Sequence, residues 1–310
     1  MYIEQGYRGR LGLWKYFILP AGIIALGIIN YISIVLSPIS VEEMTRKMIA
    51  EIGKNTFLAL NLAFMAVGLV IVLGWTKLVH PQSIRSLTTS RRKVDWGRIF
   101  FAFWIWGLLT VLQVLIAYWI SPEDYVWNFN WDAFWKLAVL AILLVPLQTS
   151  FEEYLFRGHM MQGLGILARN RWVPLLITSV LFGMMHLGNP EVEKMGPGIM
   201  VFYIGTGFFL GIITLMDEGL ELALGFHAAN NLVTALLVTA DWTAFQTDSI
   251  LLDIGEPKVS WDAYIPIFVI FPLLLYGFGR KYGWTDWKEK LFGRVLSLDE
   301  AEAHFRQESE

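Results

Sequence analysis

The 310-residue chain has no cysteine, which excludes disulfide bridges and metal sites built on thiolates. Charged residues are also scarce, at 16% of the chain against roughly 25% in a soluble domain. The formal net charge is only −3, so the sequence indicates no nucleic-acid partner. Hydrophobic residues make up 55% of the chain. The shortage of charge therefore indicates that most of the surface does not face water.

Long apolar runs account for most of this hydrophobicity. They do not alternate with polar residues, so they predict helices and make sheet unlikely. Eight runs come near the roughly 20 residues that a membrane-spanning helix needs. They are residues 15–37, 56–76, 98–120, 133–156, 172–188, 199–216, 219–239 and 263–279. We predict an all-α, polytopic transmembrane helical bundle of about eight spans, in contact with membrane lipids, whose first run is retained and is not a signal peptide.

Lysine and arginine are distributed unevenly between the two sides that eight spans would create. Eighteen of the 24 lie in residues 1–15, 77–98, 157–171 and 280–306, which share one side. Five lie on the other side, and Lys136 is near the start of the fourth run. Because cytoplasmic loops are enriched in Lys and Arg, we expect both termini in the cytoplasm of a bacterial cell, with the chain in its inner membrane.

The chain divides into four parts by motif content. These are residues 1–130 with N-terminal spans and no recognisable motif, 131–240 with three polar motifs, 241–296 with the last loop, the eighth span and a basic flank, and 297–310, a polar cytoplasmic tail. Leu298, Ala301 and Phe305 fall on one stripe of a possible tail helix, although a frayed terminus explains the tail equally well.

The first motif is Glu152-Glu153-x-x-x-Arg157, at the end of the fourth run. Glu153 and Arg157 are four residues apart, so they share a helix face and can form an ion pair. Glu152 points about 100° away and lacks that partner, which leaves its carboxylate available for chemistry. The alternative is an interfacial ion pair where the helix leaves the membrane.

The second and third motifs place imidazoles and an amide in apolar runs. Phe182 and His186 are one turn apart on one face, and so are His227 and Asn231. Taken alone, His186 is more simply an interfacial residue, and the other pair could serve as interhelical hydrogen-bonding groups. Together with the carboxylate, these groups match the needs of amide hydrolysis: a base for water, a group to orient it and donors for an oxyanion.

Water is the expected nucleophile, because neither Ser nor Cys adjoins these histidines in the sequence. The remaining histidines are weaker candidates. His80 is in a basic loop, His304 is in the polar tail, and His159 lies seven residues after Glu152.

Three motifs in this order on an eight-span chain resemble the CPBP family. That family comprises the CAAX prenyl endopeptidases and the bacteriocin-processing and self-immunity proteins. The resemblance covers about residues 133–240 and implies an intramembrane protease. It implies that Glu152 is the general base, assisted by His186, and that His227 and Asn231 donate to the oxyanion. Glu153 and Arg157, with Phe182, are then supporting residues.

The family is often labelled a metalloprotease family, and Glu152, His186 and His227 could in principle bind zinc with a fourth position open. The chain has no zincin spacing such as H-E-x-x-H, and an amide suits an oxyanion better than zinc, so no cofactor is the preferred expectation. The expected partner is a membrane-associated peptide or protein substrate. A non-catalytic scaffold or self-immunity factor using the same cavity is the alternative, and a transporter is less favoured because the polar groups do not repeat in matching halves.

Overall fold

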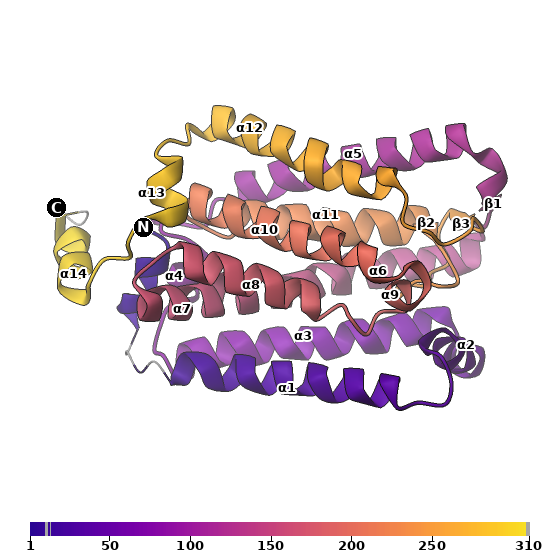
Figure 1. The fold of residues 1–310 in the computed structure, drawn as a ribbon, viewed down its shortest axis with the longest axis horizontal. Coiled ribbons are helices and arrows are strands. Elements are labelled where there is room, and N and C mark those ends of the chain that lie inside the picture. Colours follow the sequence, from indigo (N-terminus) through magenta and orange to yellow (C-terminus); the bar gives the residue numbers. More distant parts are fainter. Residues whose placement is uncertain (10–11, 13, 308–310) are drawn as a thin grey trace.

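A computed structural model describes residues 1–9, 12 and 14–307. The chain is a helical bundle whose long helices run side by side along one axis (Figure 1). The principal helices are α1 (Lys15–Val35), α2 (Val41–Ile52), α3 (Lys54–Leu78), α4 (Ile84–Thr88), α5 (Trp96–Ile120), α6 (Trp131–Glu153), α7 (Met161–Ala168), α8 (Trp172–Met184), α9 (Pro190–Met195), α10 (Met200–Asp217), α11 (Glu221–Leu237), α12 (Phe271–Tyr282), α13 (Trp287–Phe292) and α14 (Leu298–Gln307). The prediction of an all-α polytopic bundle is confirmed.

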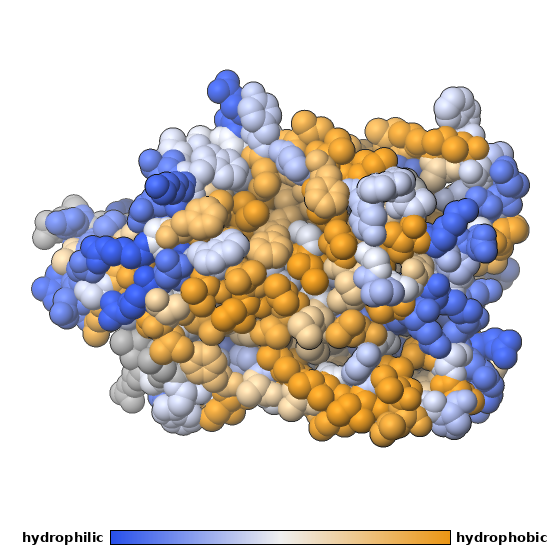
Figure 2. All heavy atoms as spheres, viewed as in Figure 1, coloured by the Kyte–Doolittle hydropathy of each residue, from blue (hydrophilic) through white to orange (hydrophobic). Residues whose placement is uncertain are grey.

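Five helical segments are long and apolar enough to cross a membrane, and they are α1, α3, α5, Trp131–Ala168 and Pro197–Asp217. Apolar side chains cover the middle of the face shown in Figure 2, and polar side chains gather at both ends of the bundle. Large hydrophobic side chains such as Phe64 (71% exposed) and Trp104 (62% exposed) point outward in this middle zone. Such a surface is suited to lipid, so the chain is an integral membrane protein.

The other three expected spans are shorter or irregular. α8 has 13 residues and α11 has 17. The last expected span combines a π-helical turn, Pro266–Ile270, with α12. The number of membrane crossings therefore stays a prediction.

The fourth run is longer than its hydropathy indicated. α6 passes through a π-helical stretch, Tyr154–Met160, into α7, which gives one 38-residue helix from Trp131 to Ala168. The predicted end of the fourth run at residue 156 is thus wrong, because the helix continues to Ala168. The count of Lys and Arg residues assigned Arg157 to one side of the membrane. The side chain of Arg157 is instead fully buried inside the bundle.

Three short strands at one end of the bundle were not expected. β1 (Tyr125–Trp127) pairs antiparallel with β3 (Leu251–Asp253), and β2 (Val238–Thr239) pairs with β3 in parallel. The strands have two or three residues each, too few to leave an alternating pattern in the sequence. They join the loop before α6 to the loop after α11.

Both labelled termini lie at the other end of the bundle, which we call the terminal end (Figure 1). The tail helix α14 packs on this end through Ala301, which is fully buried, and Phe305, whose ring lies 3.9 Å from the guanidinium of Arg8. The helical interpretation of residues 298–307 is therefore confirmed over a frayed end, and residues 308–310 lie outside the described part of the chain.

An aromatic cluster holds α11 against α5, α10 and α12. Phe226 on α11 lies 4.4 Å from the Trp106 ring on α5 and 4.7 Å from the Phe209 ring on α10, centroid to centroid. Gly225 permits the close approach of α5, since a Cβ there would lie 2.0 Å from the Ile99 carbonyl oxygen. The cluster fixes the helix that carries the third motif.

Candidate active site

The turn between α7 and α8 brings the first two motifs to the same depth. α8 packs against α7, and residues 169–171 connect them. At 1.5 Å rise per residue, Glu152 lies about 24 Å from the end of α7, and Met184 lies about 18 Å from the start of α8. Because the fourth helix continues to Ala168 before the chain turns back into α8, His186, just after Met184, lies at a depth similar to that of Glu152.

Glu153 and Arg157 form a buried ion pair, as their spacing predicts. Both side chains are 0% exposed, and Arg157 Nη1 lies 3.0 Å from Glu153 Oε1. Arg157 Nη2 also donates to the carbonyl of Gly207 on α10 at 3.0 Å. The guanidinium lies 4.2 Å from the centroid of the Phe182 ring on α8. One arginine therefore connects three helices, and the Phe182 ring packs against it.

His227 lies between the two glutamates. Its Nδ1 is 2.7 Å from Glu153 Oε1, and its Nε2 is 3.8 Å from Glu152 Oε2. The carboxylate of Glu153 accepts a hydrogen bond from Nδ1–H, which fixes the ring so that Nε2 faces Glu152. Arg157, Glu153 and His227 therefore form a chain of charge-assisted contacts that ends at the candidate base.

A second chain of hydrogen bonds reaches Glu152 from the opposite direction. The indole N–H of Trp106 donates to Asn230 Oδ1 at 3.0 Å, and Asn230 Nδ2 donates to Asn231 Oδ1 at 3.0 Å. Asn231 Nδ2 donates to Gln148 Oε1 at 3.0 Å, and Gln148 Nε2 donates to Glu152 Oε1. All four bonds run in one direction and end on the carboxylate.

Sequence reasoning did not identify Trp106, Gln148 or Asn230. Gln148 precedes Glu152 by four residues, the same helical spacing that identified Glu153 and Arg157, so it could have been found. Asn230 adjoins Asn231 of the third motif in the sequence. Trp106 lies on a different helix, and nothing in its local sequence indicates its partner.

His186 occupies the edge of the site beside Phe182. Its Nδ1 is 2.8 Å from the carbonyl of Phe182, and its ring stacks on Tyr203 with centroids 4.2 Å apart. The Phe182 ring lies between the two imidazoles, 5.0 Å from that of His186 and 5.8 Å from that of His227. With Nδ1 held by the carbonyl, Nε2 is the nitrogen available to a substrate or water.

The expected alternative metal ligands can be tested by their arrangement. Within residues 1–9, 12 and 14–307, no three His, Cys, Asp or Glu side chains converge closely enough to hold a metal ion. The residues therefore do not fit a three-ligand zinc site in this arrangement.

Two of the weaker histidine candidates lie together, away from this site. His80 and His159 are buried with Tyr16, and their ring centroids are 5.1 Å apart. His304 lies on α14 at the terminal end. The three motifs, in contrast, are brought together by α6, α8 and α11.

Comparisons with known proteins agree with this arrangement. A family model for type II CAAX prenyl endopeptidases, Rce1-like, matches residues 130–233, which contain all three motifs. The uncharacterized protein YyaK of Bacillus subtilis (strain 168) is 30% identical over 268 residues, covering 84% of this chain and 90% of its own length. No solved structure matches the chain. The chain belongs to the Rce1-like family of type II CAAX prenyl endopeptidases.

Proposed function

We propose that this protein is an intramembrane endopeptidase in which Glu152 activates water to hydrolyse a peptide bond of a membrane-associated substrate. The observation that carries the proposal is the carboxylate of Glu152, 8% exposed, held between the amide of Gln148 and the imidazole of His227. A carboxylate that accepts one amide hydrogen bond, with its second oxygen 3.8 Å from an imidazole nitrogen and a little remaining access, is suited to accept a proton from water.

The reaction assigns each motif a step. Glu152 takes a proton from a water molecule, whose oxygen attacks the scissile carbonyl carbon while His186 orients it. The tetrahedral intermediate carries a negative oxygen, which Asn231 and His227 stabilise. Glu152 then returns its proton to the leaving nitrogen, and the C–N bond breaks.

The donors are available for this role on chemical grounds. An amide nitrogen carries two N–H groups, and Asn231 uses one of them on Gln148. Because Nδ1–H of His227 faces Glu153, donation from Nε2 requires the doubly protonated ring. The mechanism needs no metal, and the lack of fit to a three-ligand zinc site favours this version.

Hydrolysis of a membrane-embedded reporter peptide by the purified, reconstituted protein tests the proposal. We expect cleavage by the wild type and its loss in Glu152→Gln, with the same melting behaviour in both. Full activity in the variant would remove this mechanism. Specific binding of a membrane peptide without cleavage would support the scaffold or self-immunity alternative.

A further inference from the structure

His186 follows the end of α8, so no regular helix fixes its backbone. α8 ends at Met184, and the amide N–H of His186 donates to the carbonyl of Gly183 at 3.0 Å, one residue short of the α-helical spacing. The amide N–H of Asn189 in turn donates to the His186 carbonyl at 2.9 Å. A functional side chain on such a turn needs contacts of its own to keep one orientation.

The imidazole of His186 has two side-chain torsions and, among the residues that the structure describes, one hydrogen bond. Its Nδ1 lies 2.8 Å from the carbonyl of Phe182. That contact fixes which edge of the imidazole faces α8, but a single bond leaves the ring free to tilt about it. The direction in which Nε2 points is therefore not set by this bond alone.

The phenol ring of Tyr203 supplies the second constraint. It stacks on the imidazole of His186 with the centroids 4.2 Å and the planes 20° apart, so the two rings are nearly parallel and in contact. Tilting the imidazole about its bond to Phe182 would push one edge of the imidazole into the phenol. With one edge and the plane of the imidazole both fixed, Nε2 has a single direction.

Close packing between α8 and α10 brings Tyr203 to this position. Gly183 has no side chain, and a Cβ there would lie 2.4 Å from Ile204 Cγ1 and 2.9 Å from the Ile204 backbone nitrogen. Tyr203 adjoins Ile204 in the first turn of α10, and His186 follows Gly183 by three residues. The glycine therefore sets the distance at which the phenol meets the imidazole.

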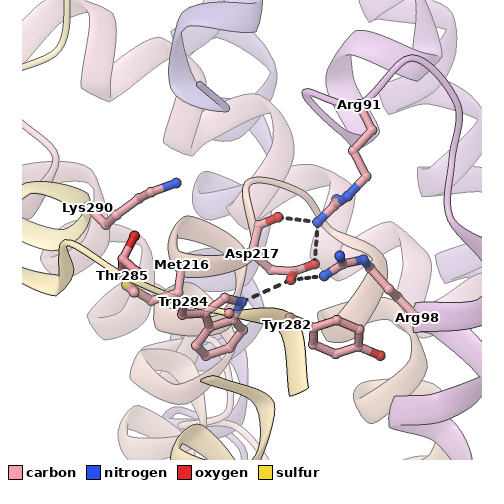
Figure 3. Close-up of a pocket in the computed structure, with 9 residues that line it drawn as sticks. Arg91, Arg98, Met216, Asp217, Tyr282, Trp284, Thr285 and Lys290 are labelled. Atoms are coloured by element: carbon pink, nitrogen blue, oxygen red, sulfur yellow. Dashed lines mark hydrogen bonds and ion pairs between the residues drawn. The ribbon is translucent and has the colours of Figure 1, made fainter. Parts of the chain in front are cut away.

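Charged groups anchor the opposite end of α10. Asp217, its last residue, is 3% exposed and accepts from Arg91 Nη2 at 2.8 Å and from the indole N–H of Trp284 at 3.1 Å. Figure 3 shows Arg98 directed at the same carboxylate. These partners come from the loop before α5, from α5 and from the segment after α12. Tyr203 is thus carried by a helix that is fixed at both ends.

The hydroxyl of Tyr203 is held more weakly than its ring. Asn189 Nδ2 lies 3.5 Å from the hydroxyl oxygen, at the long limit for a hydrogen bond. Asn189 belongs to the same turn as His186, so both parts of Tyr203 contact that turn. Because the bond is long and the ring contact is close, the ring carries the orientation of His186.

We propose that Tyr203 is a positioning residue for hydrolysis, whose ring holds the imidazole of His186 so that Nε2 faces the water activated by Glu152. This inference rests on the proposed protease function. Tyr203 acts through His186, and its hydroxyl takes no part in proton transfer. Because misplacing a group by about 1 Å can cost about 10²-fold in rate, loss of the stacked ring should lower turnover and leave substrate binding almost unchanged.

Hydrolysis of the reporter peptide by two variants separates the ring from the hydroxyl. We expect Tyr203→Phe to keep kcat within about threefold of the wild type, and Tyr203→Leu to lower kcat about 10–100-fold with little change in KM. The control is Tyr276→Leu, the same change at a residue of α12 that is 69% exposed, and it should leave kcat unchanged. Equal losses in Tyr203→Phe and Tyr203→Leu would overturn the proposal and assign the role to the hydroxyl.

A double-variant cycle tests whether Tyr203 acts through His186. Tyr203→Leu should lower kcat no further in a His186→Ala background, because no imidazole is left to position. A further loss in that background, or a loss larger than that of His186→Ala itself, would contradict the proposed route. Tyr203→Met, which also lacks a planar ring, repeats the test if Tyr203→Leu does not fold.

NMR of the histidine-labelled protein in detergent tests the ring contact without any activity. The chain has five histidines, so the signals of His186 are identified by their loss in His186→Ala. An aromatic ring shifts the signals of protons over its face upfield, so the His186 ring protons should be shifted in the wild type and in Tyr203→Phe. The shift should disappear in Tyr203→Leu, and its persistence there would overturn the proposal.

The two readouts distinguish failure of the positioning role from failure of the protease function. If the wild type cleaves the reporter and Tyr203→Leu keeps its kcat, the positioning role is wrong and the protease function stands. If the NMR signals change as expected and the wild type cleaves no peptide, the protease function fails, and the positioning role in hydrolysis fails with it.

Discussion

Replacing Arg157 with alanine should destabilise the fold as well as abolish activity. The guanidinium is 0% exposed, and it is bound to Glu153, to the Gly207 carbonyl and to the face of Phe182. Its removal leaves the carboxylate of Glu153 buried with only His227 beside it. Breaking a buried ion pair by removing one partner costs roughly 3–5 kcal/mol, and the orphaned carbonyl acts in the same direction.

Unfolding in detergent, followed by heat or by denaturant titration, measures this loss. A matched control is Arg294→Ala, which removes an arginine that bonds Glu300 through two nitrogens but is 65% exposed. We expect no measurable change in the control, because solvent screens exposed ion pairs and leaves both partners hydrated. The difference between the two variants separates the stabilising effect of a buried ion pair from that of an exposed one.

A double variant separates the contribution of the two charges to stability from the contribution of the volume that the two side chains fill. Glu153→Gln combined with Arg157→Met removes both charges, so it should lose less stability than the sum of the two single changes. Unchanged melting of Arg157→Ala would refute the reasoning and assign Arg157 a role facing the substrate or solvent. Activity should be lost in Arg157→Ala, in Glu153→Gln and in the double variant. In each of them His227 loses either the carboxylate that orients it or the arginine that holds that carboxylate.

Further changes test the other groups, each by hydrolysis of the membrane-embedded reporter. Glu152→Gln should lower the rate about 10²–10⁴-fold, as the loss of a general base does. Asn231→Ala should cost on the order of 10²–10³-fold, as the loss of an oxyanion donor does. Gln148→Leu should also lower the rate without unfolding the protein. Unchanged kinetics would show that the reactivity of Glu152 does not depend on its hydrogen bond from Gln148. Chelators should leave the wild type active, whereas inactivation together with stoichiometric zinc in elemental analysis would contradict the metal-free mechanism. Reporters fused after Glu310 and within residues 121–132 should lie on opposite sides of the membrane, and finding them on one side would contradict eight spans with cytoplasmic termini.

The sequence predicted those features that depend on contacts between residues close together along one helix. The pairing of Glu153 with Arg157 follows from a spacing of four residues, and the structure confirms it. Helical class followed from the length of the apolar runs and their lack of alternation, because only helices and closed barrels satisfy their backbone groups in lipid and barrel strands alternate.

The features that the sequence did not reveal depend on how helices meet. Hydropathy ended the fourth span near Arg157, because it treats a polar residue as the edge of a span. A polar residue marks that edge only when it faces water or headgroups. Here Arg157 and His159 are buried against other helices, so the helix runs on to Ala168.

A single tryptophan sets the polarity of the hydrogen-bond chain that ends on Glu152. The indole nitrogen of Trp106 can donate and cannot accept, so the oxygen of Asn230 must face it. Each amide further along is then left with one consistent orientation, and the last of them must present N–H to Glu152. If Glu152 took up a proton on the oxygen facing Gln148, the N–H of Gln148 would have no acceptor there. Rotating the Gln148 amide to accept that proton would require Asn231 and Asn230 to rotate as well, which would leave the N–H of Trp106 without an acceptor. In the proposed mechanism, the aromatic ring on α5 thus directs the proton taken from water to Oε2, the carboxylate oxygen on the side of His227.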